Sequence, residues 1–570
     1  MVLAALVAAG VGLTSSGIAQ AAAPAAAPSS PASGVAGLDA TKKLPGKTFN
    51  SSADRTVVSS KAGERAAAPT QGAPAQDAPA QNAPAAQSAA NLGVDLEASA
   101  FSAHGFSLKT TLSSSETTTG NLTISWGDGT TSSYPVALTA GVANPHVDIH
   151  QYKTVGAFDI TVTLTSGTVV AKNQVQVVTA GAEFTPHTPT RLLDTREGIG
   201  AAKAKVPARG TVALKIDGAA QIPAGVAAVV LNVTVTNTSG SGHISVAPSQ
   251  DLAQNATTSS LNFVPGQTVP NLVVASVGPD GYVYLFNSDW APVDLLADVT
   301  GYFTPTTASG YKSVPQTRIV DTREGIGTAQ GKVPATSGFD VAVAGRNGVP
   351  SGVTAVALNL TVTNPQADGH LIAYPTGQAV PTTSNVNFTA GQTVANAVIV
   401  PVGQDGKITV RNGSWLPTDA VVDVVGYYSP ASRSALVPLV SPERVLDTRE
   451  TTPDRTGAPM PGRSFFALGM EGDTTSPQVE GWVLNTTVTN TAGAGFLSVD
   501  TDPNYWSAYR NGTAVVPQRP VSSTLNWTAG ATVPNLAQTP GGKGGIIDFW
   551  NQSWSDADLL VDLLGFYQSN

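Results

Sequence analysis

One charged hexapeptide occurs three times in a chain in which charged residues make up only 12% of the composition. It reads RLLDTR from Arg191, RIVDTR from Arg318 and RVLDTR from Arg444. In an extended segment the Asp and the second Arg share one face, because they are two residues apart, and the first Arg points the other way. Because a planar guanidinium can hold a carboxylate through two hydrogen bonds, the motif predicts either a clamp that ties a strand to its sandwich or a site for a carboxylate or sugar acid, and we favour the clamp. The residues concerned are Arg191, Asp194, Arg196, Arg318, Asp321, Arg323, Arg444, Asp447 and Arg449.

A second recurring motif, N-x-x-W, lies in a polar loop of each copy, at Asn287 and Trp290, Asn412 and Trp415, and Asn551 and Trp554. A large aromatic side chain in a polar loop can stack on a sugar ring while neighbouring amides bind its hydroxyl groups. The plainer alternative, a Trp that caps the end of a sandwich, stays open. The third copy adds an aromatic insertion, and binding residues concentrate on the loops of rigid scaffolds. We therefore take these Trp and Asn residues as candidate binding residues, together with Tyr505, Trp506 and Tyr509 of the insertion.

The motifs of common hydrolases are missing from the sequence. There is no H-E-x-x-H and no G-x-S-x-G, which mark zinc hydrolases and α/β hydrolases. His243 and His370 occupy one repeat position, but the third copy has Phe496 there. Paired acidic residues can cleave glycosides, so a glycan hydrolase or esterase that uses the recurring acids remains the enzymatic alternative. We predict no catalytic residue and no metal site, and calcium held by Asp clusters is the one cofactor that we consider.

The composition argues against several classes of function. The net charge is −9, without a cluster of Lys and Arg, whereas a nucleic-acid-binding surface needs concentrated positive charge. The chain has no cysteine, so disulfides and thiolate metal sites are excluded. Its 57 Gly and 40 Pro, with many Thr, Val and Ser, favour strands and turns over long helices.

The N-terminal residues are typical of an exported protein. Residues 1–21 resemble a secretory signal peptide, with an apolar run followed by the cleavage pattern A-Q-A. No basic residue occurs before Lys42, which we interpret as a sign that the true start lies upstream or that the assigned start is wrong, and an Ala-rich disordered tail is the alternative to a signal peptide. Residues 22–91 are rich in Ala, Pro, Ser and Gln and predict a disordered spacer. Since no later segment has the roughly 20 apolar residues that cross a bilayer, we expect a secreted protein that is free or held at the cell wall.

From residue 181 onward the chain consists of three copies of one unit. The hexapeptides begin 127 and 126 residues apart, and the run N-(V/L/T)-T-V-T-N shows the same two spacings. This period is too long for a solenoid coil or a propeller blade, so each unit is a whole domain. Each contains seven to nine short strand-like runs between Gly and Pro turns, which predicts a β-sandwich or jelly roll. We place the repeat domains at 181–306, 307–432 and 433–570.

The preceding segment, residues 92–180, alternates polar and apolar residues between Gly and Asp turns, which predicts a small antiparallel sandwich. The stretch ISWGDGT from Ile124 resembles the W-x-F-G-D-G signature of PKD-type immunoglobulin-like domains, and H-x-Y from His150 resembles their later strands. One residue of that signature is missing after Trp126. The resemblance implies a non-catalytic spacer or binding module, and Asp128 is interpreted as a turn residue.

The repeat motifs R-x-(L/V)-D-T-R, N-(V/L/T)-T-V-T-N and D-(V/L)-x-G-(Y/F)-(F/Y) resemble repeats of secreted actinobacterial proteins. That resemblance implies an extracellular or wall-associated location and no settled activity. The predicted fold is all-β: a disordered N-terminal region, a PKD/immunoglobulin-like sandwich and three homologous jelly-roll-like sandwiches. The predicted function is non-catalytic, multivalent binding to cell-wall or environmental polysaccharide. A purely structural extracellular spacer is the third alternative, and the oligomeric state and the packing of the repeats stay open.

Overall fold

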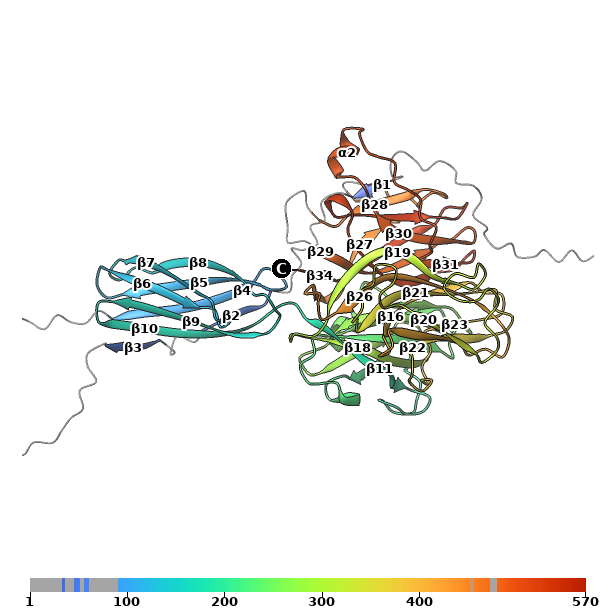
Figure 1. The fold of residues 1–570 in the computed structure, drawn as a ribbon, viewed down its shortest axis with the longest axis horizontal. Helices are drawn as coiled ribbons and strands as arrows, with labels where there is room; N and C mark the ends of the chain where they lie inside the picture. The colour runs from blue at the N-terminus through green and yellow to red at the C-terminus, as the bar shows by residue number, and fades with distance from the viewer. Residues whose placement is uncertain are drawn as a thin grey trace, which may run out of the picture.

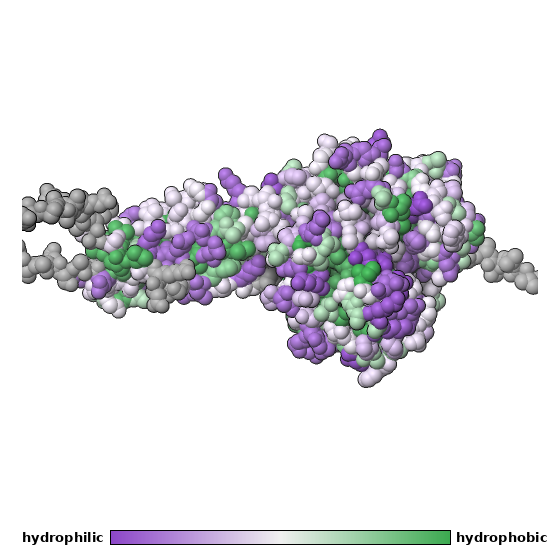
Figure 2. All heavy atoms as spheres, turned by 90° about the horizontal axis from the view of Figure 1, so that it is seen from below, coloured by the Kyte–Doolittle hydropathy of each residue, from purple (hydrophilic) through white to green (hydrophobic). Residues whose placement is uncertain are grey.

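The computed structural model describes residues 33–35, 46–51, 56–60, 91–452, 455–471 and 479–569. This part of the chain is built almost entirely of β-strands, as predicted, with only short helical turns. A slender N-terminal sandwich is joined to a much broader body formed by the three repeats (Figure 1), and the space-filling view in Figure 2, turned by 90°, shows the same two parts. The predicted signal peptide lies outside the described residues, as does most of the predicted spacer.

The N-terminal sandwich consists of two antiparallel sheets. One sheet has the order β2 (Thr48–Asn50), β4 (Leu92–Ala100), β5 (Gly105–Ser114) and β8 (Asn144–Gln151). The other has the order β3 (Val57–Ser60), β10 (Val169–Val178), β9 (Ala157–Ser166), β6 (Thr118–Ser125) and β7 (Thr131–Leu138). Trp126 and Tyr152 are buried between them. Asp128 Oδ1 accepts hydrogen bonds from the backbone N–H and the hydroxyl of Thr130, at 3.0 and 2.6 Å, as expected of a turn residue.

Three short strands lie within the segment that the sequence predicts as a spacer. β1 (Ser33–Val35) pairs in parallel with β28 (Phe465–Gly469) of the third repeat. β2 and β3 extend the two sheets of the N-terminal sandwich, and the ring of Phe49 in β2 lies 6.0 Å from that of Phe106. In these segments the structure differs from the predicted spacer, because a sheet edge offers backbone hydrogen bonds to any extended segment whatever its composition.

Each repeat folds into eight strands that form an inner and an outer sheet. In the first repeat the inner sheet has the order β11 (Glu183–Asp194), β18 (Asp294–Thr304), β13 (Ala228–Thr236) and β16 (Val269–Ser276). In the second repeat the order is β19 (Gly310–Asp321), β26 (Asp419–Ser429), β21 (Ala355–Thr363) and β24 (Val394–Pro401). In the third repeat it is β27 (Ala435–Asp447), β34 (Asp558–Gln568), β29 (Val479–Thr489) and β32 (Val533–Thr539). The outer sheet of the first repeat has the order β12 (Thr211–Lys215), β17 (Tyr282–Asn287), β14 (Gly242–Ala247) and β15 (Leu261–Phe263). That of the second has the order β20 (Gly338–Ala342), β25 (Lys407–Asn412), β22 (Gly369–Pro375) and β23 (Val386–Phe388). That of the third has the order β28, β33 (Ile546–Asn551), β30 (Gly495–Thr501) and β31 (Leu525–Trp527). All three copies share this strand order, which is that of a jelly roll.

The central inner strands are buried on both faces. All nine residues of β13, AVVLNVTVT, are buried. Leu231 and Val233 face the core of their own sandwich, whereas Ala228 and Val230 belong to a second core that contains residues of all three repeats. This double burial explains why the strand has no polar face that water could reach.

The inner sheets face one another around a common axis, so the repeats form one closed body with approximate threefold symmetry. β16, β24 and β32 are edge strands, and each contacts the other two. Leu272, Ala397 and Leu536, one from each of these strands, share the core along the axis. The hydroxyls of Tyr428 and Tyr567 are hydrogen-bonded at 2.6 Å in the same core. The repeats, whose packing the sequence left open, are therefore not independent domains on a string.

Asparagines of the repeat motifs join each repeat to the next. The Nδ2 atoms of Asn396, Asn535 and Asn271 donate to Oδ1 of Asn232, Asn359 and Asn485, respectively, at 3.1 Å in every case. These contacts run from the second repeat to the first, from the third to the second and from the first to the third, so they close a ring. The edge-strand N–H groups of Leu272 and Ala397 donate to Oδ1 of Asn396 and Asn535. The ring of amides thus satisfies backbone groups that would otherwise be unpaired in a buried interface.

The N-terminal sandwich is attached at one end of this axis. The N–H of Ala103 donates to Gln568 Oε1 at 2.8 Å, and the N–H of Gly181 donates to the Ala103 carbonyl at 2.9 Å. The first strand of each repeat begins near this end, where β-bridges link Ala182 with Leu436. At about 3.3 Å per residue, these strands carry the hexapeptides roughly 30 Å away, to the opposite end of the body, which we call the distal face.

Candidate functional site

The hexapeptide holds the first strand of each repeat to the last. Arg191 donates through Nε and Nη2 to the two carboxylate oxygens of Asp298, at 2.5 and 3.2 Å, and through Nη1 to Asp194 at 2.9 Å. Arg196 donates through Nε and Nη2 to Asp194 at 2.9 and 2.7 Å. The other two clamps are formed by Arg318, Asp321, Arg323 and Asp423, and by Arg444, Asp447, Arg449 and Asp562.

The prediction that the first Arg points away from the Asp is wrong. Arg191 reaches Asp194 because β11 contains an irregularity, in which its pairing with β18 shifts between Arg191 and Leu193. A bulge of this kind re-aims a side chain. The strict alternation of faces on which the prediction depends applies only to a regular strand.

The carboxylates of the clamps are buried, their arginines are partly exposed, and the charges are paired. The side-chain hydrogen bond from Arg196 lowers the pKa of Asp194 to about 2. Burial raises the pKa of Asp298 above its ordinary value, although the hydrogen bond from Arg191 opposes that rise. Three of the five N–H donors of Arg191 bond these two carboxylates and Nη2 also donates to the Thr382 carbonyl at 3.4 Å, so its charge is already paired within the protein. The geometry is that of a structural clamp.

A second set of hydrogen bonds occupies another recurring acid. The hydroxyl of Thr195 donates to Asp294 Oδ1 at 2.8 Å, and Asn237 Nδ2 donates to Asp294 Oδ2 at 2.7 Å. The same bonds recur in the second and third repeats. The recurring aspartates on which the enzymatic alternative depends are thus bound by Arg, Thr or Asn in every copy, whereas the recurring Glu197, Glu324 and Glu450 take no part in these bonds.

The Asn of each N-x-x-W loop shapes the loop. Asn287 is buried, and its Nδ2 donates to the backbone oxygens of Pro207 and Ala291 at 3.0 and 2.9 Å, while its Oδ1 accepts the N–H of Asp289 at 3.0 Å. Asn412 and Asn551 make the equivalent bonds. Since their amide groups are used within the protein, these three residues position the loops and are not placed to bind a sugar hydroxyl.

The Trp of each loop projects into solvent. The exposed fractions are 84% for Trp290, 82% for Trp415 and 74% for Trp554. A Trp that capped a sandwich would be largely covered, so these values exclude that alternative. A single exposed apolar side chain is ordinary at a protein surface, so it is the recurrence of an exposed Trp at the equivalent position of all three repeats that marks these positions.

Two of the three Trp rings are held by an arginine. The guanidinium of Arg209 lies 5.7 Å from the centre of the Trp290 ring, and that of Arg463 lies 5.0 Å from the centre of the Trp554 ring, as in cation–π contacts. The second repeat has Thr336 at the equivalent place, so Trp415 lacks this contact. These arginines could not be found from the repeat pattern, because the position is not kept in all three copies.

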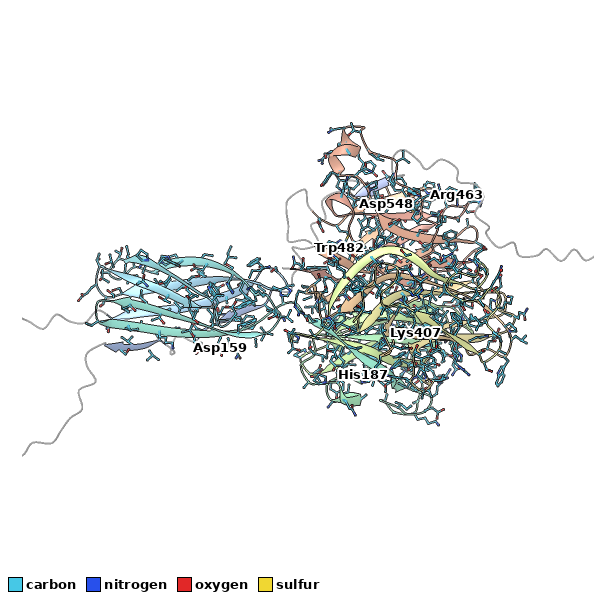
Figure 3. All side chains as sticks on the ribbon, in the orientation of Figure 1. Asp159, His187, Lys407, Arg463, Trp482 and Asp548 are labelled. Carbon is cyan, nitrogen blue, oxygen red and sulfur yellow. The ribbon has the colours of Figure 1, made fainter. Side chains whose placement is uncertain are left out.

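The three Trp residues lie at the distal face. Each precedes the last strand of its repeat by four residues, and these strands begin at the end of the body remote from the N-terminal sandwich. Figure 3 shows Arg463, which contacts Trp554, at this end of the third repeat, with Trp482 nearer the N-terminal sandwich. The threefold body therefore presents three exposed indole rings around one face.

The aromatic insertion of the third repeat is mostly a packing element. Its short helix α2 (Trp506–Arg510) places Trp506 and Tyr509 against the buried Trp550 of the outer sheet. The hydroxyl of Tyr509 donates to Asp502 Oδ2 at 2.5 Å. Of the three predicted aromatic residues, Tyr505 is the exposed one, at 55%. The sequence could not separate these roles, because the sheet that the helix covers is formed by distant strands.

A hollow of about 940 Å³ opens at the distal face between the three repeats. It is lined by the turns that precede β16, β24 and β32, including Thr268, Thr393 and Thr532. Below it, the side chains of the axial core close the space between the same three strands. The sequence motif x-T-V-x-N contains these threonines, but it could not show that three copies meet around one opening.

Among the described residues, no group of three or more His, Asp or Glu side chains is arranged to hold a metal ion. Calcium binding therefore stays a prediction without a site in this part of the chain. No helix in the same residues has the length and apolar character needed to cross a membrane.

Comparisons with known proteins give no family for this chain. No family model matches it, and no curated protein matches it. Among solved structures it is similar to a chain of the Sulfolobus Turreted Icosahedral Virus and to a chain from a study of the triple jelly roll fold and turret assembly in an archaeal virus. For each of these two chains the sequence identity is 9%, and the match spans 68% of the present chain and 91% of the other chain, with a TM-score of 0.14. A TM-score this low supports no inference about fold or function.

Proposed function

We propose that this protein is a non-catalytic, trivalent glycan-binding protein that acts outside the cell, with a cell-wall or environmental polysaccharide as its target. The observation that carries the proposal is the exposure of Trp290, Trp415 and Trp554, between 74% and 84%, at equivalent positions around one face. Their loops are fixed from below by buried asparagines, so the rings stand on a rigid support.

An exposed indole suits the apolar face of a sugar ring. Covering roughly 80 Å² of apolar surface stabilises a contact by about 2 kcal/mol before the costs of association are counted. A single Trp is therefore a weak site. Three such sites on one rigid body can raise the apparent affinity for a polymer by about 100-fold or more when all three engage the same particle. The arrangement fits an extended or insoluble glycan better than a small free sugar.

The proposal predicts that a protein with Trp290→Ala, Trp415→Ala and Trp554→Ala together loses retention on insoluble glycans. The expected loss is about 100-fold or more in apparent affinity, because all three contacts are removed at once. The measurement is a pull-down of the full chain on purified bacterial cell walls, chitin, cellulose and insoluble β-glucan. Because the rings are exposed, we expect the melting temperature to change little.

The matched control is Tyr505→Ala, which removes an exposed aromatic ring from the insertion and leaves the distal face intact. Its retention should equal that of the unmodified protein. Unchanged retention of the triple Trp variant on every glycan that the unmodified protein binds would refute the proposed site. Loss of retention in the Tyr505→Ala protein alone would move the binding site to the insertion.

A further inference from the structure

We propose that the hollow at the distal face is a second glycan site, which binds the end of a neutral oligosaccharide chain. The inference deepens the proposed function and rests on it, but it concerns residues that the exposed Trp loops do not contain. The hollow has a volume of about 940 Å³, which is within the range of small-molecule pockets. It is also built by all three repeats, so it exists only because the ring of repeats closes.

The shape of the hollow favours the end of a chain over its middle. Asn396 lies at its wall and takes part in the amide ring that joins the repeats. Beyond the amide ring, Leu272, Ala397 and Leu536 pack together on the axis. The hollow is therefore blind. A linear polymer can enter from the distal face but cannot pass through the body, so its terminal sugars are the part that fits.

The walls carry hydroxyl groups in pairs. The hydroxyls of Thr236 and Thr268 are hydrogen-bonded at 2.7 Å, and the equivalent pairs, Thr363 with Thr393 and Thr489 with Thr532, are bonded at 2.9 and 2.7 Å. In each pair one proton is used between the two oxygens, which leaves one donor and several acceptor positions. Thr268, Thr393 and Thr532 are exposed and line the hollow. Three such sets match the donors and acceptors of sugar hydroxyls.

Two side-chain oxygens at the walls have no hydrogen-bond partner. They are Oδ1 of Asn387 and Oδ1 of Asn526, which occupy the same position in the second and third repeats. The equivalent Asn262 accepts a hydrogen bond from the Ser259 hydroxyl at 3.0 Å. A buried acceptor without a donor is costly, but neither oxygen has accessible surface, so a ligand would reach them only after a small shift of the wall, and the exposed threonine hydroxyls are the polar groups that the hollow offers directly.

The charge of the walls favours a neutral ligand. The charged residues that line the hollow are Arg191, Arg196 and Asp368. Both arginines are held by clamp carboxylates, and Asp368 Oδ1 accepts the N–H of Ala390 at 2.8 Å. Burial lowers the pKa of His370, which keeps this side chain neutral at pH 7. The clamp arginines are paired, and the exposed Asp368 carries the one unpaired charge among these lining residues, so the hollow has no free cation that would hold an acidic sugar.

The test uses soluble hexasaccharides that are too short to bridge the Trp loops efficiently. Binding of cellohexaose, maltohexaose, chitohexaose, mannohexaose and hexagalacturonate to the full chain is measured by calorimetry. Two triple variants are compared with the unmodified protein. Thr268→Phe, Thr393→Phe and Thr532→Phe fill the hollow, whereas Thr268→Val, Thr393→Val and Thr532→Val keep its shape and remove the hydroxyls.

We expect at least one neutral hexasaccharide to bind the unmodified protein. Its affinity should fall about tenfold in the Val variant and below detection in the Phe variant, and it should persist in the triple Trp variant. The proposal is overturned if no neutral hexasaccharide binds, if only hexagalacturonate binds, or if the Phe variant binds as well as the unmodified protein.

Failure of the Trp site is a separate result, which is measured as retention of the Trp variants on insoluble glycan. Because the three threonines are exposed, the Val variant should melt within a few degrees of the unmodified protein, and its binding result stands even if the Phe variant is less stable.

Discussion

Arg191→Met is expected to lower the free energy of unfolding by about 3–5 kcal/mol, the cost of removing one partner from a buried ion pair. The substitution keeps most of the length of the side chain but leaves Asp298, which is 1% exposed, without its guanidinium. Asp194 is still hydrogen-bonded to Arg196, so Asp298 is the carboxylate that loses its cationic partner. The measurement is chemical or thermal unfolding of the full chain, followed by near-ultraviolet circular dichroism.

The loss should depend on pH in a defined direction. Burial already raises the pKa of Asp298, and removal of Arg191 raises it further, because the hydrogen bond that opposed the rise is gone. A carboxyl with a raised pKa in the folded state takes up a proton on folding, so its cost is small at low pH and grows as pH rises. The deficit of the Arg191→Met protein should therefore be smaller at pH 5 than at pH 8.

Two further variants separate the clamp from general disruption. Adding Asp298→Asn to Arg191→Met should recover much of the loss, because no buried charge then remains without a partner. Arg196→Met, whose Arg is 41% exposed, should cost about 1 kcal/mol or less. Equal losses for Arg191→Met and Arg196→Met, with no recovery in the double variant, would contradict the assigned clamp.

Asp548→Asn is expected to stabilise the protein at neutral pH by an amount on the order of 4 kcal/mol. Asp548 is fully buried in β33, where its polar neighbour is the carboxylate of Asp502 and no donor group of another residue reaches either of its oxygens. Figure 3 places it in the third repeat. Burial, reinforced by the charge of the neighbouring Asp502, raises its pKa to about 10. In the unfolded chain an Asp titrates near pH 4.

The sign of the effect follows from these two pKa values. The folded state holds a proton that the unfolded state has lost, so the contribution of Asp548 is most favourable below about pH 4. It then falls by about 1.4 kcal/mol for each pH unit up to about pH 10. An amide does not titrate, so this slope should disappear in the Asp548→Asn protein. Unfolding free energies measured between pH 5 and 8 would show it.

Asp95→Asn is the control for that measurement, because Asp95 is exposed on β4 and its replacement should leave the pH profile unchanged. If the Asp548→Asn protein keeps the slope of the unmodified protein, or is less stable at pH 8, the raised pKa is not the dominant property of this buried carboxyl.

Local patterns in the sequence were enough to predict the all-β fold and repeats of seven to nine strands, where the structure has eight, since both depend on alternation and turns within about 126 residues. The same patterns did not predict the contact between Arg191 and Asp194, because that contact depends on an irregularity in the strand pairing. Arg191 reaches Asp194 only because of the shift in pairing next to it, and no residue type in RLLDTR marks that shift. The clamp was predicted from its chemistry, and its geometry was not.

The assembly of the repeats could not be predicted from one repeat at a time. Asn271 and Asn485 are 214 residues apart and meet only because the third repeat closes on the first. Within a single repeat, the sequence around these asparagines predicts that they stabilise a turn. Asn271 does donate a hydrogen bond to the Ser260 carbonyl, in addition to its contact with Asn485. The N-x-x-W motif has the same limit, because a capping Trp and an exposed Trp have the same neighbours in sequence.

The most direct test of trivalent binding is the retention of single, double and triple Trp→Ala variants on an insoluble glycan that the unmodified protein binds. We expect each replacement to weaken retention by roughly tenfold, so that each single variant is still bound and the triple variant is lost. Trp415→Ala should have the smallest single effect, because no arginine holds its ring. Complete loss from any one replacement, or wild-type retention of the triple variant, would contradict trivalent binding through these three residues.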